Sequence, residues 1–599
     1  MRYSSNFGPP NSLSGTSDSP LSDRPLTAVA SKISGVPLSY MESYGYELLV
    51  AGSPDLLVSA GTGGEFNVAR DAFAKNFIRA FIADGTTSLK NIRGRFAIAL
   101  RRQTDNSLLL AVDRFATIPV YFAHHGSQLL FSESCAEMPD QLRSDDQISK
   151  QSLFSYLFFH TIPGPDSIYK RIFKLSPASF LRWSTKDFEV ATYWTPTFAE
   201  KTRDSFSEQT RELHYHLERA IPALPDTANV GCFLSGGLDS STVLGYLSRS
   251  RPGETAAFSI GFGADGYDEM SYARAAAAHF GANLHEYYVT QTDIIDVIPE
   301  IASGYDQPFG NSSAVPALYC ARLASAAGID IMLAGDGGDE IFAGNERYAK
   351  QKLFEYYTRI PALLRKLLLE PVFLKSSTIP NLPIARKIGR YVEQAIVPLP
   401  DRFETYNYLH NHAMESVLSS RFLEQVDTTK PLSGLRDRFW EPEDASTLNR
   451  MLYLDWKYTL ADNDLPKVTR MCQLAGIQVE FPFLHDDLVE FSTRVPSSRK
   501  LPGTKLRHFF RQSVSHFLPE KVLNKEKHGF GLPFGTWVVT DPQLRNYTYQ
   551  TLERLRDREI FAPQFIDTIK RAAEEEHAAY YGTLLWVLMM LEEWLAQHH

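Results

Sequence analysis

The stretch SGGLDSS, residues 235–241, lies between the apolar run VGCFL (230–234) and the helix-like segment TVLGYL (242–247). Such a position is typical of a turn from a buried strand into a helix, whose N-terminus offers free N–H groups and a positive dipole end to an anion. Gly236 and Gly237 let the backbone approach an anion closely, and the hydroxyls of Ser235, Ser240 and Ser241 add donors. The stretch predicts a pyrophosphate cradle, although a serine-capped turn would explain SGG alone.

The residues around this stretch alternate between strand and helix patterns. Strands are predicted at 229–234, 255–261, 285–289 and 329–335, and helices at 268–279, which ends at Gly281, and at 313–327, which ends at Gly328. This alternation predicts a parallel sheet with helices on both faces. From about residue 345 the pattern is mostly helical, and it ends in LLWVLMMLEEWL (584–595).

The N-terminal part has a different pattern of apolar segments and turns. Residues 1–25 are rich in Ser, Pro and Gly and predict a disordered tail. Residues 26–195 contain short apolar segments separated by turns, and two strands flanking 125–128 are typical of a hairpin. We therefore expect a β-rich domain at 26–195 and a second domain at 205–599.

Composition and charge exclude several classes of protein. Hydrophobic residues make up 44% and charged residues 22% of 599 residues, and the net charge of −9 disfavours a protein that coats nucleic acid. The four cysteines are far apart and form neither a disulfide framework nor a zinc motif. No apolar run approaches the length of a membrane span, and no export signal is visible. These features predict a cytoplasmic protein without nucleic-acid or membrane partners.

Two further motifs carry charged groups suited to phosphate chemistry. The acidic turn LAGDGGDE (333–340) again follows a predicted strand, and Asp239 lies in the first turn. Carboxylates at two strand ends suit Mg²⁺ bound to ATP, because Mg²⁺ prefers hard oxygen ligands. Alone, the acidic turn could be a calcium loop or a solvated turn. The third motif, NKEKHGFGLP (524–533), would alone indicate only a surface lysine.

Together these motifs resemble the asparagine synthetase family over most of residues 90–599. The matching stretches are SGGLDSS, SIGFG (259–263), DQPFGNSSAVP (306–316), AGDGGDEIFAGNERY (334–348), VEFPFLHDDLVEF (479–491), KLR (505–507) and KHGFGLP (527–533). The resemblance implies an α/β fold, with an N-terminal β-rich sandwich of the Ntn-hydrolase type and a C-terminal PP-loop synthetase domain whose last part is helical. It also implies a ligase that adenylates a carboxylate with Mg²⁺ and ATP and forms an amide.

The resemblance assigns roles by motif match. Residues expected to line the base and ribose are Leu234, Ile260, Ala334 and Gly335. Ser235, Gly237 and Ser240 would bind the pyrophosphate, and Asp239 and Asp339 would hold magnesium. Lys527 would stabilise phosphate charge in the transition state. Asp336 occupies the position of a family Glu or Tyr and would accept a proton from the amine.

The first domain resembles the family's glutaminase in RGRFAIAL (93–100), LLLAVDRFATIPVYF (108–122) and LLFSES (129–134). Glutamine-dependent members use a cysteine at the start of the mature chain, whereas no cysteine precedes Cys135 here. The glutamine-gripping segments are also not found. Since a thioester needs its thiol, we expect that glutaminase activity is lost and that the domain serves as a scaffold or docks substrate.

The nitrogen would then come from ammonia or from an amine on the substrate. β-Lactam synthetase-type enzymes and lasso-peptide cyclases use the second route, in which tethering supplies effective concentration. We favour this route, a macrolactam or similar ring. Glu480 and His485 stand where arginine and aspartate are usual, and Thr469 where aspartate is frequent. These differences weaken the case for aspartate as substrate, and compensating surface change explains them equally well.

Three alternatives stay open. The chain could be an asparagine synthetase that uses aspartate, ATP and ammonia, or a non-catalytic scaffold protein. A PP-loop enzyme of tRNA modification or sulfur transfer would need reactive cysteines and a basic face, and neither is visible. The expected partners are a small-molecule or peptide carboxylate as substrate, together with a precursor-processing protein or a second copy of the chain in a homodimer.

Overall fold

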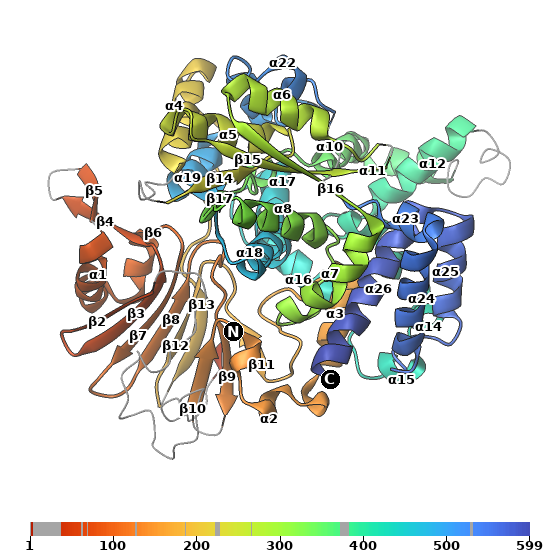
Figure 1. The fold of residues 1–599 in the computed structure, drawn as a ribbon, viewed down its shortest axis with the longest axis horizontal. Coiled ribbons are helices and arrows are strands. Elements are labelled where there is room, and N and C mark those ends of the chain that lie inside the picture. Colours follow the sequence, from red (N-terminus) through yellow and green to blue (C-terminus); the bar gives the residue numbers. More distant parts are fainter. Residues whose placement is uncertain are drawn as a thin grey trace.

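The computed structural model describes residues 2–3, 38–60, 64–68, 70–125, 128–185, 187–221, 228–264, 266–371, 383–526 and 531–599. Figure 1 shows N-terminal antiparallel sheets, a parallel sheet flanked by helices, and a mostly helical C-terminal part. The expected α/β fold class is thereby confirmed. Of the tail expected at 1–25, only Arg2–Tyr3 are described, and they form strand β1; the rest lies outside the described residues.

The first domain is built around a seven-stranded antiparallel sheet in the order β1-β13-β12-β8-β7-β3-β2. Its strands are β2 (Leu38–Ser43), β3 (Tyr46–Gly52), β7 (Phe96–Arg102), β8 (Leu108–Val112), β12 (Ser179–Trp183) and β13 (Phe188–Thr192). Two small sheets accompany it: β9 (Tyr121–His125), β10 (Gln128–Ser132) and β11 (Ile172–Lys174), and then β4 (Asp55–Ala60), β5 (Gly64–Val68) and β6 (Ile92–Arg93). The predicted hairpin at 125–128 is confirmed as β9–β10.

The apolar runs of this domain are continuous because the large sheet is buried on both faces. In β8, Leu108 and Leu110 pack into a core shared with β9 and β10, whereas Leu109 and Ala111 pack on the opposite face with α1 (Arg70–Asp84). Successive strand residues point to opposite faces, so two apolar layers require an unbroken apolar strand. The sheet is therefore the middle layer of this domain.

The second domain contains a five-stranded parallel sheet in the order β16-β15-β14-β17-β18. Its strands are β14 (Val230–Phe233), β15 (Ala256–Phe262), β16 (Asn283–Val289), β17 (Ile331–Leu333) and β18 (Gln478–Glu480). Helices α4 (Phe206–Ala220), α5 (Leu238–Ser250), α6 (Met270–Phe280), α7 (Gln291–Gly304) and α8 (Ala314–Ala326) surround it. The four predicted strands and both predicted helices are present. Strand β18 was not predicted, because three residues are too few to show a periodicity.

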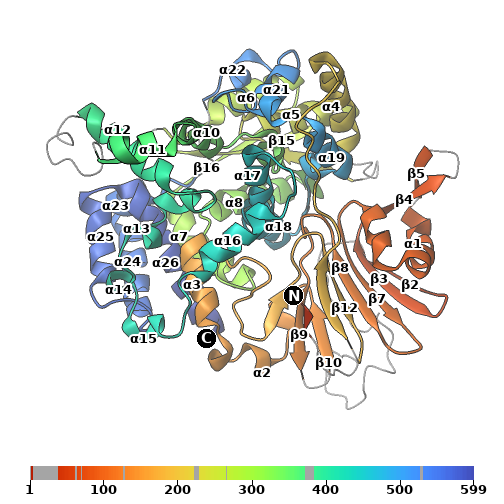
Figure 2. The same cartoon turned by 180° about the vertical axis from the view of Figure 1, so that it is seen from behind.

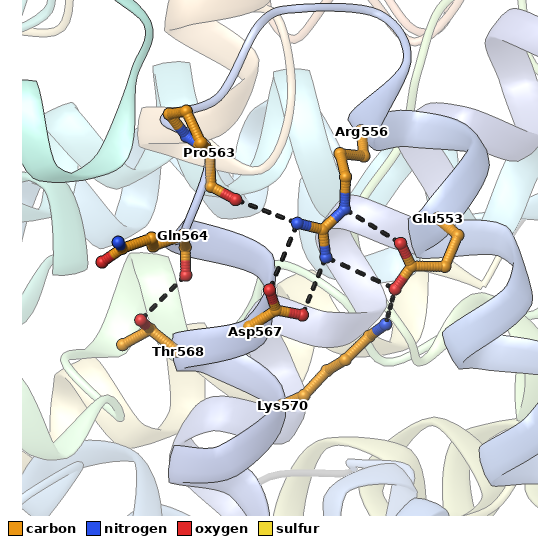
Figure 3. Close-up of polar contacts among 7 residues, drawn as sticks. All are labelled: Glu553, Arg556, Pro563, Gln564, Asp567, Thr568 and Lys570. Atoms are coloured by element: carbon orange, nitrogen blue, oxygen red, sulfur yellow. Dashed lines mark hydrogen bonds and ion pairs between the residues drawn. The ribbon is translucent and has the colours of Figure 1, made fainter.

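Most of the remaining chain is helical, as predicted. Its longer helices are α10 (Glu346–Thr358), α12 (Pro383–Ile396), α16 (Lys430–Trp440), α17 (Thr447–Asp455), α18 (Leu465–Leu474), α19 (Asp486–Arg494), α24 (Pro542–Arg556), α25 (Phe565–Glu575) and α26 (Ala578–His598). Arg556 on α24 bonds Asp567 on α25, and Glu553 joins Arg556 to Lys570 (Figure 3). The apolar α26 is buried among α7, α23 (Phe534–Thr540), α24 and α25. Among the described helices, none has the length and apolar character needed to cross a bilayer.

The two domains are joined by polar contacts from RGRFAIAL (93–100) and LLLAVDRFATIPVYF (108–122) of the first domain to VEFPFLHDDLVEF (479–491) of the second. Arg114 bonds Asp486 at 2.9 Å and Glu490 at 2.7 Å, and Gly94 N donates to Asp486 at 2.6 Å. Arg93 also reaches Glu490, at 2.8 Å. These buried and half-buried charges fix the first domain against α19 of the second.

Candidate active site

The candidate site lies at the point in the parallel sheet where the order of the strands reverses. From β14 the chain builds outward to β15 and β16, whereas β17 and β18 lie on its other side. Strands β14 and β17 are neighbours at this point, and ligands of open α/β sheets bind at the carboxyl ends of the strands at such a switch point. The glycine loop 235–241 follows β14, and the acidic turn 334–340 follows β17 (Figure 1).

The glycine loop has a backbone that only glycine fits at residue 236. Gly236 has φ +67°, and a Cβ there would lie 2.5 Å from backbone atoms of Tyr272 and Ala273. Gly237 is the N-cap of α5, so the helix points its free N–H groups into the loop. The hydroxyls of Ser235 and Ser240 are 3.1 Å apart, and Ser235 Oγ accepts from Gly237 N at 3.3 Å. The loop is thus held in shape by its own serines.

Ser241 lies elsewhere. It was expected to add a hydroxyl donor to the cradle, but it lies in α5 with its side chain fully buried, and its Oγ has no hydrogen-bond partner among the described residues. The helical periodicity turns this residue away from the loop that its neighbour Ser240 faces. That expectation was wrong.

The two carboxylates expected to hold magnesium meet at one cation. Arg507 donates to both carboxylate oxygens of Asp239, at 3.0 and 2.7 Å, and it also forms an ion pair with Asp339. The two turns touch directly, since a Cβ on Gly338 would lie 2.3 Å from Asp239 Oδ1. The sequence pattern placed both carboxylates at strand ends, and the structure brings them together. Arg507 belongs to the KLR stretch, but nothing in the sequence indicated this contact.

The donor set fits Mg²⁺ only in part. Asp239 and Asp339 supply hard carboxylate oxygens close enough to share one cation. Within the described ranges no group of three or more His, Cys, Asp or Glu side chains could hold a metal ion. Magnesium commonly takes one or two carboxylates and completes its shell with phosphates and water. Two protein ligands therefore suit a metal that arrives with a nucleotide.

Asp336 lies on the same turn beside a buried lysine. Lys467 Nζ is 3.9 Å from Asp336 Oδ1 and 2.8 Å from Asp464 Oδ1. Burial raises the pKa of Asp336 to about 6, against the opposing effect of Lys467 and with a further rise caused by Asp464. Asp336 is thus a carboxylate that changes protonation near neutral pH, which suits a general base. Lys467 and Asp464 were not predicted to belong to the site.

The residues expected to line the base and ribose are mostly buried in the sheet. Leu234 N donates to Phe258 O and Ala334 N donates to Glu480 O, both at sheet distances of 2.8 to 2.9 Å. Ile260 lies within β15, and its side chain is buried. Gly335 adjoins the glycine loop, since its Cβ would lie 2.9 Å from Ser240 N. Leu234 and Ala334 are thus held to the sheet through their backbone.

Lys527 lies outside the described residues, as does the 528–530 stretch that follows it. Within the same motif, Lys525 contacts the glycine loop: its Nζ donates to Ser235 O at 2.9 Å and pairs with Glu269 at 2.9 Å. Burial lowers the pKa of Lys525. The motif NKEKHGFGLP thus brings a cation to the loop through a residue that the sequence comparison did not single out.

Two cavities accompany the site. One, of about 70 Å³, lies between the domains and is lined by buried ion pairs, Lys174 with Asp462 at 2.8 Å and Arg470 with Asp306. Thr469 lines it, and its hydroxyl has no hydrogen-bond partner among the described residues. The other, of about 60 Å³, lies between the sheets of the first domain and is mostly aliphatic. Ile118, Pro119 and Glu133 border both cavities.

All four cysteines are buried and free of disulfides. Burial raises the pKa of each thiol, Cys135 of the first domain included. No cysteine is among the described residues that line either cavity. None of these thiols therefore resembles an accessible, thiolate-forming nucleophile.

Strand order, glycine loop and paired carboxylates define an α/β protein with a candidate site for a phosphate-bearing ligand at the sheet's switch point. The family model described as asparagine synthase matches residues 212–596, and the model of a glutamine amidotransferase domain matches residues 61–194. The first match covers more than half of the chain, and the protein belongs to the asparagine synthase family. At this level it is an ATP-dependent ligase.

Named relatives include enzymes of two kinds. The asparagine synthetase (glutamine-hydrolyzing) 1 of Bacillus subtilis is 26% identical over 462 residues, which cover 75% of this chain and 69% of the relative. A putative asparagine synthetase (glutamine-hydrolyzing) of Mycobacterium tuberculosis is 23% identical, and the aligned region covers 86% of this chain and 78% of the relative. Amidase chry2 of Gibberella zeae is 21% identical, and the aligned region covers 79% of this chain and 74% of the amidase.

Proposed function

We propose that the protein uses Mg²⁺ and ATP to adenylate a carboxylate, releasing pyrophosphate, and then forms an amide with an amine that the substrate itself carries, as in a macrolactam or β-lactam ring closure. The convergence of Asp239 and Asp339 beside the glycine loop carries this proposal. With a magnesium ion bound between them, these two carboxylates would help to neutralise phosphate charge where a pyrophosphate leaves.

In the first step a carboxylate oxygen attacks the α-phosphorus of ATP, the α–β phosphoanhydride bond breaks, and pyrophosphate leaves. The N–H groups at the start of α5 bind the departing pyrophosphate, and Ser235 and Ser240 hold the loop in place. Magnesium bound by Asp239 and Asp339 would neutralise charge on the phosphates. Lys525 keeps the loop against Glu269.

In the second step the amine nitrogen attacks the acyl carbon of the adenylate and the C–N bond forms. The bond between the acyl carbon and the phosphate oxygen breaks, and AMP leaves with that oxygen. The nitrogen must lose a proton, and we propose Asp336, whose pKa is raised to about 6, as the group that accepts it. Lys467, 3.9 Å away, keeps Asp336 ionised over a wider pH range. Attack from within the same molecule supplies effective concentration that dilute ammonia lacks.

The nitrogen source is proposed to be independent of glutamine. The four cysteines of the chain are buried with raised pKa values, and a glutaminase of this class needs a reactive thiolate. With glutamine as the only nitrogen donor, we expect no glutamate to form. Glutamate released at the rate of amide formation would contradict this part of the proposal.

The test of the first step is ATP–pyrophosphate exchange. We expect Asp239→Asn or Lys527→Ala to abolish exchange with the fold intact, since both belong to the proposed phosphate site. Asp140→Asn, at a 91% exposed side chain in the first domain, serves as the matched control and should leave exchange unchanged. Normal exchange in either site variant would remove that residue from the mechanism. No exchange by the unaltered protein with any carboxylate would favour a non-catalytic scaffold.

A second candidate is an asparagine synthetase that uses aspartate, ATP and ammonia. The names of the Bacillus and Mycobacterium relatives favour it. Pyrophosphate release on addition of aspartate and ammonium, with asparagine as product, would establish this activity. Release that depends instead on one compound bearing both carboxylate and amine, without ammonium, would favour ring closure.

A further inference from the structure

A helical arm outside the active site has its own small core. It consists of α10 (Glu346–Thr358), α11 (Ala362–Leu364), the π-helical turn η6 (Arg365–Leu369) and α12 (Pro383–Ile396). Phe354 and Tyr357 on α10 pack against Val392 and Ala395 on α12, apart from the main core. Tyr391 Oη also donates to Leu353 O at 2.7 Å. The arm is therefore a folded unit whose core is already filled.

A second set of apolar side chains on this arm faces outward. Leu363 is 70% exposed and Leu367 is 65% exposed, and being four residues apart they lie on one side of the helical turn. Fifteen large apolar side chains are exposed among the described residues, and the arm holds seven of them: Leu353, Tyr356, Leu363, Leu364, Leu367, Ile388 and Ile396. Scattered exposed leucines are ordinary, whereas such a concentration marks an interaction surface.

The arm is also strongly basic in a chain that is acidic overall. The described residues of the arm, 346–371 and 383–396, contain nine Lys or Arg and four Glu, while the whole chain has a net charge of −9. Lys366 lies next to Leu367, and its side chain is exposed, as is that of Arg359. Cations beside exposed leucines are complementary to a surface that is apolar inside and negatively charged at its edge.

The arm lies at the periphery of the molecule. Figures 1 and 2 show α11 and α12 at the outer edge, beyond the helical C-terminal part. Neither cavity described above is lined by the arm. A protruding ridge with leucines on it suits a soft, flat partner better than one that must enter a groove.

From these observations we infer that the described part of the arm, 346–371 and 383–396, docks the protein on an anionic phospholipid surface. The leucines enter the boundary between headgroups and acyl chains, and the basic residues bind the anionic headgroups. The protein would lie on the bilayer rather than cross it, consistent with the absence of a spanning helix among the described residues. A protein that lies on a bilayer needs no membrane-spanning segment, so the lack of a long apolar run in the sequence does not exclude this surface.

Vesicle sedimentation tests the inference. The full chain should sediment with vesicles of phosphatidylcholine mixed with phosphatidylglycerol, more weakly at high salt, and should stay in solution with phosphatidylcholine alone. The double variant Leu363→Glu/Leu367→Glu should bind at least about tenfold more weakly, and so should Arg359→Glu/Lys366→Glu. ATP–pyrophosphate exchange should be unchanged in both, because neither pair belongs to the site.

Two matched controls lie in the first domain. Ile82→Glu changes an isoleucine that is 52% exposed on α1, and Arg182→Glu changes an arginine whose side chain is 53% exposed. Both should bind vesicles like the unaltered chain. The inference is overturned if the unaltered chain does not bind anionic vesicles, or if the leucine variant binds equally well. It is also overturned if sedimentation velocity shows a dimer that the leucine variant dissociates, since the arm would then contact a second copy.

Discussion

At the residue scale, the burial of Asp336 changes the pKa of a side chain proposed to accept a proton. Its carboxyl group has a pKa raised to about 6, so it is ionised above that pH and protonated below it. If it accepts the amine proton, the rate of amide formation should fall as pH decreases through about 6. Adenylation should not follow the same profile, because it needs no proton transfer from nitrogen. The separate profiles of kcat for amide formation and of ATP–pyrophosphate exchange check this expectation.

The neighbouring lysine offers a sharper test of the same residue. Lys467→Met removes the positive charge that lowers the pKa of Asp336, so the midpoint of the amide-forming profile should move to higher pH. Asp336→Asn should reduce kcat about 10²- to 10⁴-fold, in the range usual for a general base. A midpoint that stays in place in Lys467→Met would mean that another group controls the profile.

At the element scale, the turn between β14 and α5 depends on backbone geometry more than on side-chain chemistry. Gly236→Ala would put a Cβ 2.5 Å from backbone atoms of Tyr272 and Ala273 in α6, in addition to the strain of φ +67°. Backbone cannot move aside as a flexible side chain can. We expect a loss of at least about 3 kcal/mol in the free energy of unfolding, measured in urea, together with weakened ATP binding.

Gly253→Ala is the matched control for that substitution. Gly253 has φ +81°, but a Cβ there would meet nothing within 4 Å. In this variant only the conformational strain applies. The free energy of unfolding should therefore fall by about 1 kcal/mol, and ATP binding should be retained. If the two variants lost equal free energy of unfolding, the close approach of α6 to the loop would not be the reason that residue 236 must be glycine.

At the scale of the whole molecule, domain docking depends on buried ion pairs. Arg114 and Asp486 have side chains only 4% and 8% exposed, and Gly94 N also bonds Asp486. Asp486→Ala would leave a buried guanidinium without its main partner, and about 3–5 kcal/mol of stability should be lost. Urea unfolding of the full chain, with proteolysis between the domains as a second readout, measures this loss.

An exposed network provides the comparison. Asp567 pairs with Arg556 on the surface of the C-terminal helices, and its side chain is 55% exposed (Figure 3). Asp567→Ala should change stability by about 0.5 kcal/mol, because solvent screens such pairs. Replacing both buried partners, Arg114→Met with Asp486→Leu, should restore much of what Asp486→Ala removes. If the double variant is as unstable as the single one, the buried charge is not the cause.

Parts of the fold and site followed from local patterns. The strand predicted at 229–234 is β14 (Val230–Phe233), and the helix predicted to end at Gly281 does so with Gly281 in the left-handed conformation. Apolar runs and glycine caps report local energetics, so a single sequence contains them. Strand β18 differs, because its three residues become a strand only by pairing with β17, nearly 150 residues earlier.

The motif residues of the loop and of the acidic turn could be named because each motif is contiguous. Arg507 could not, since it contacts Asp239 across 268 residues of chain and carries no local signal of that contact. The contacts of Lys467 and Lys525 with the site likewise join residues far apart in the sequence, so only the distances in the structure showed them. Ser241 failed as a prediction because a helical turn, once formed, directs adjacent side chains to different sides.

By itself the amino-acid sequence determined the chemical groups available and their attachment to strand ends, because glycine, serine and carboxylate patterns act over a few residues. The tertiary structure alone decided that β14 and β17 are neighbours, and hence that Asp239, Asp339 and Arg507 share one point in space. It also decided that the basic, leucine-rich arm faces outward. Both outcomes depend on long-range packing, in which burying one surface against another selects among arrangements that local preferences leave equal in energy.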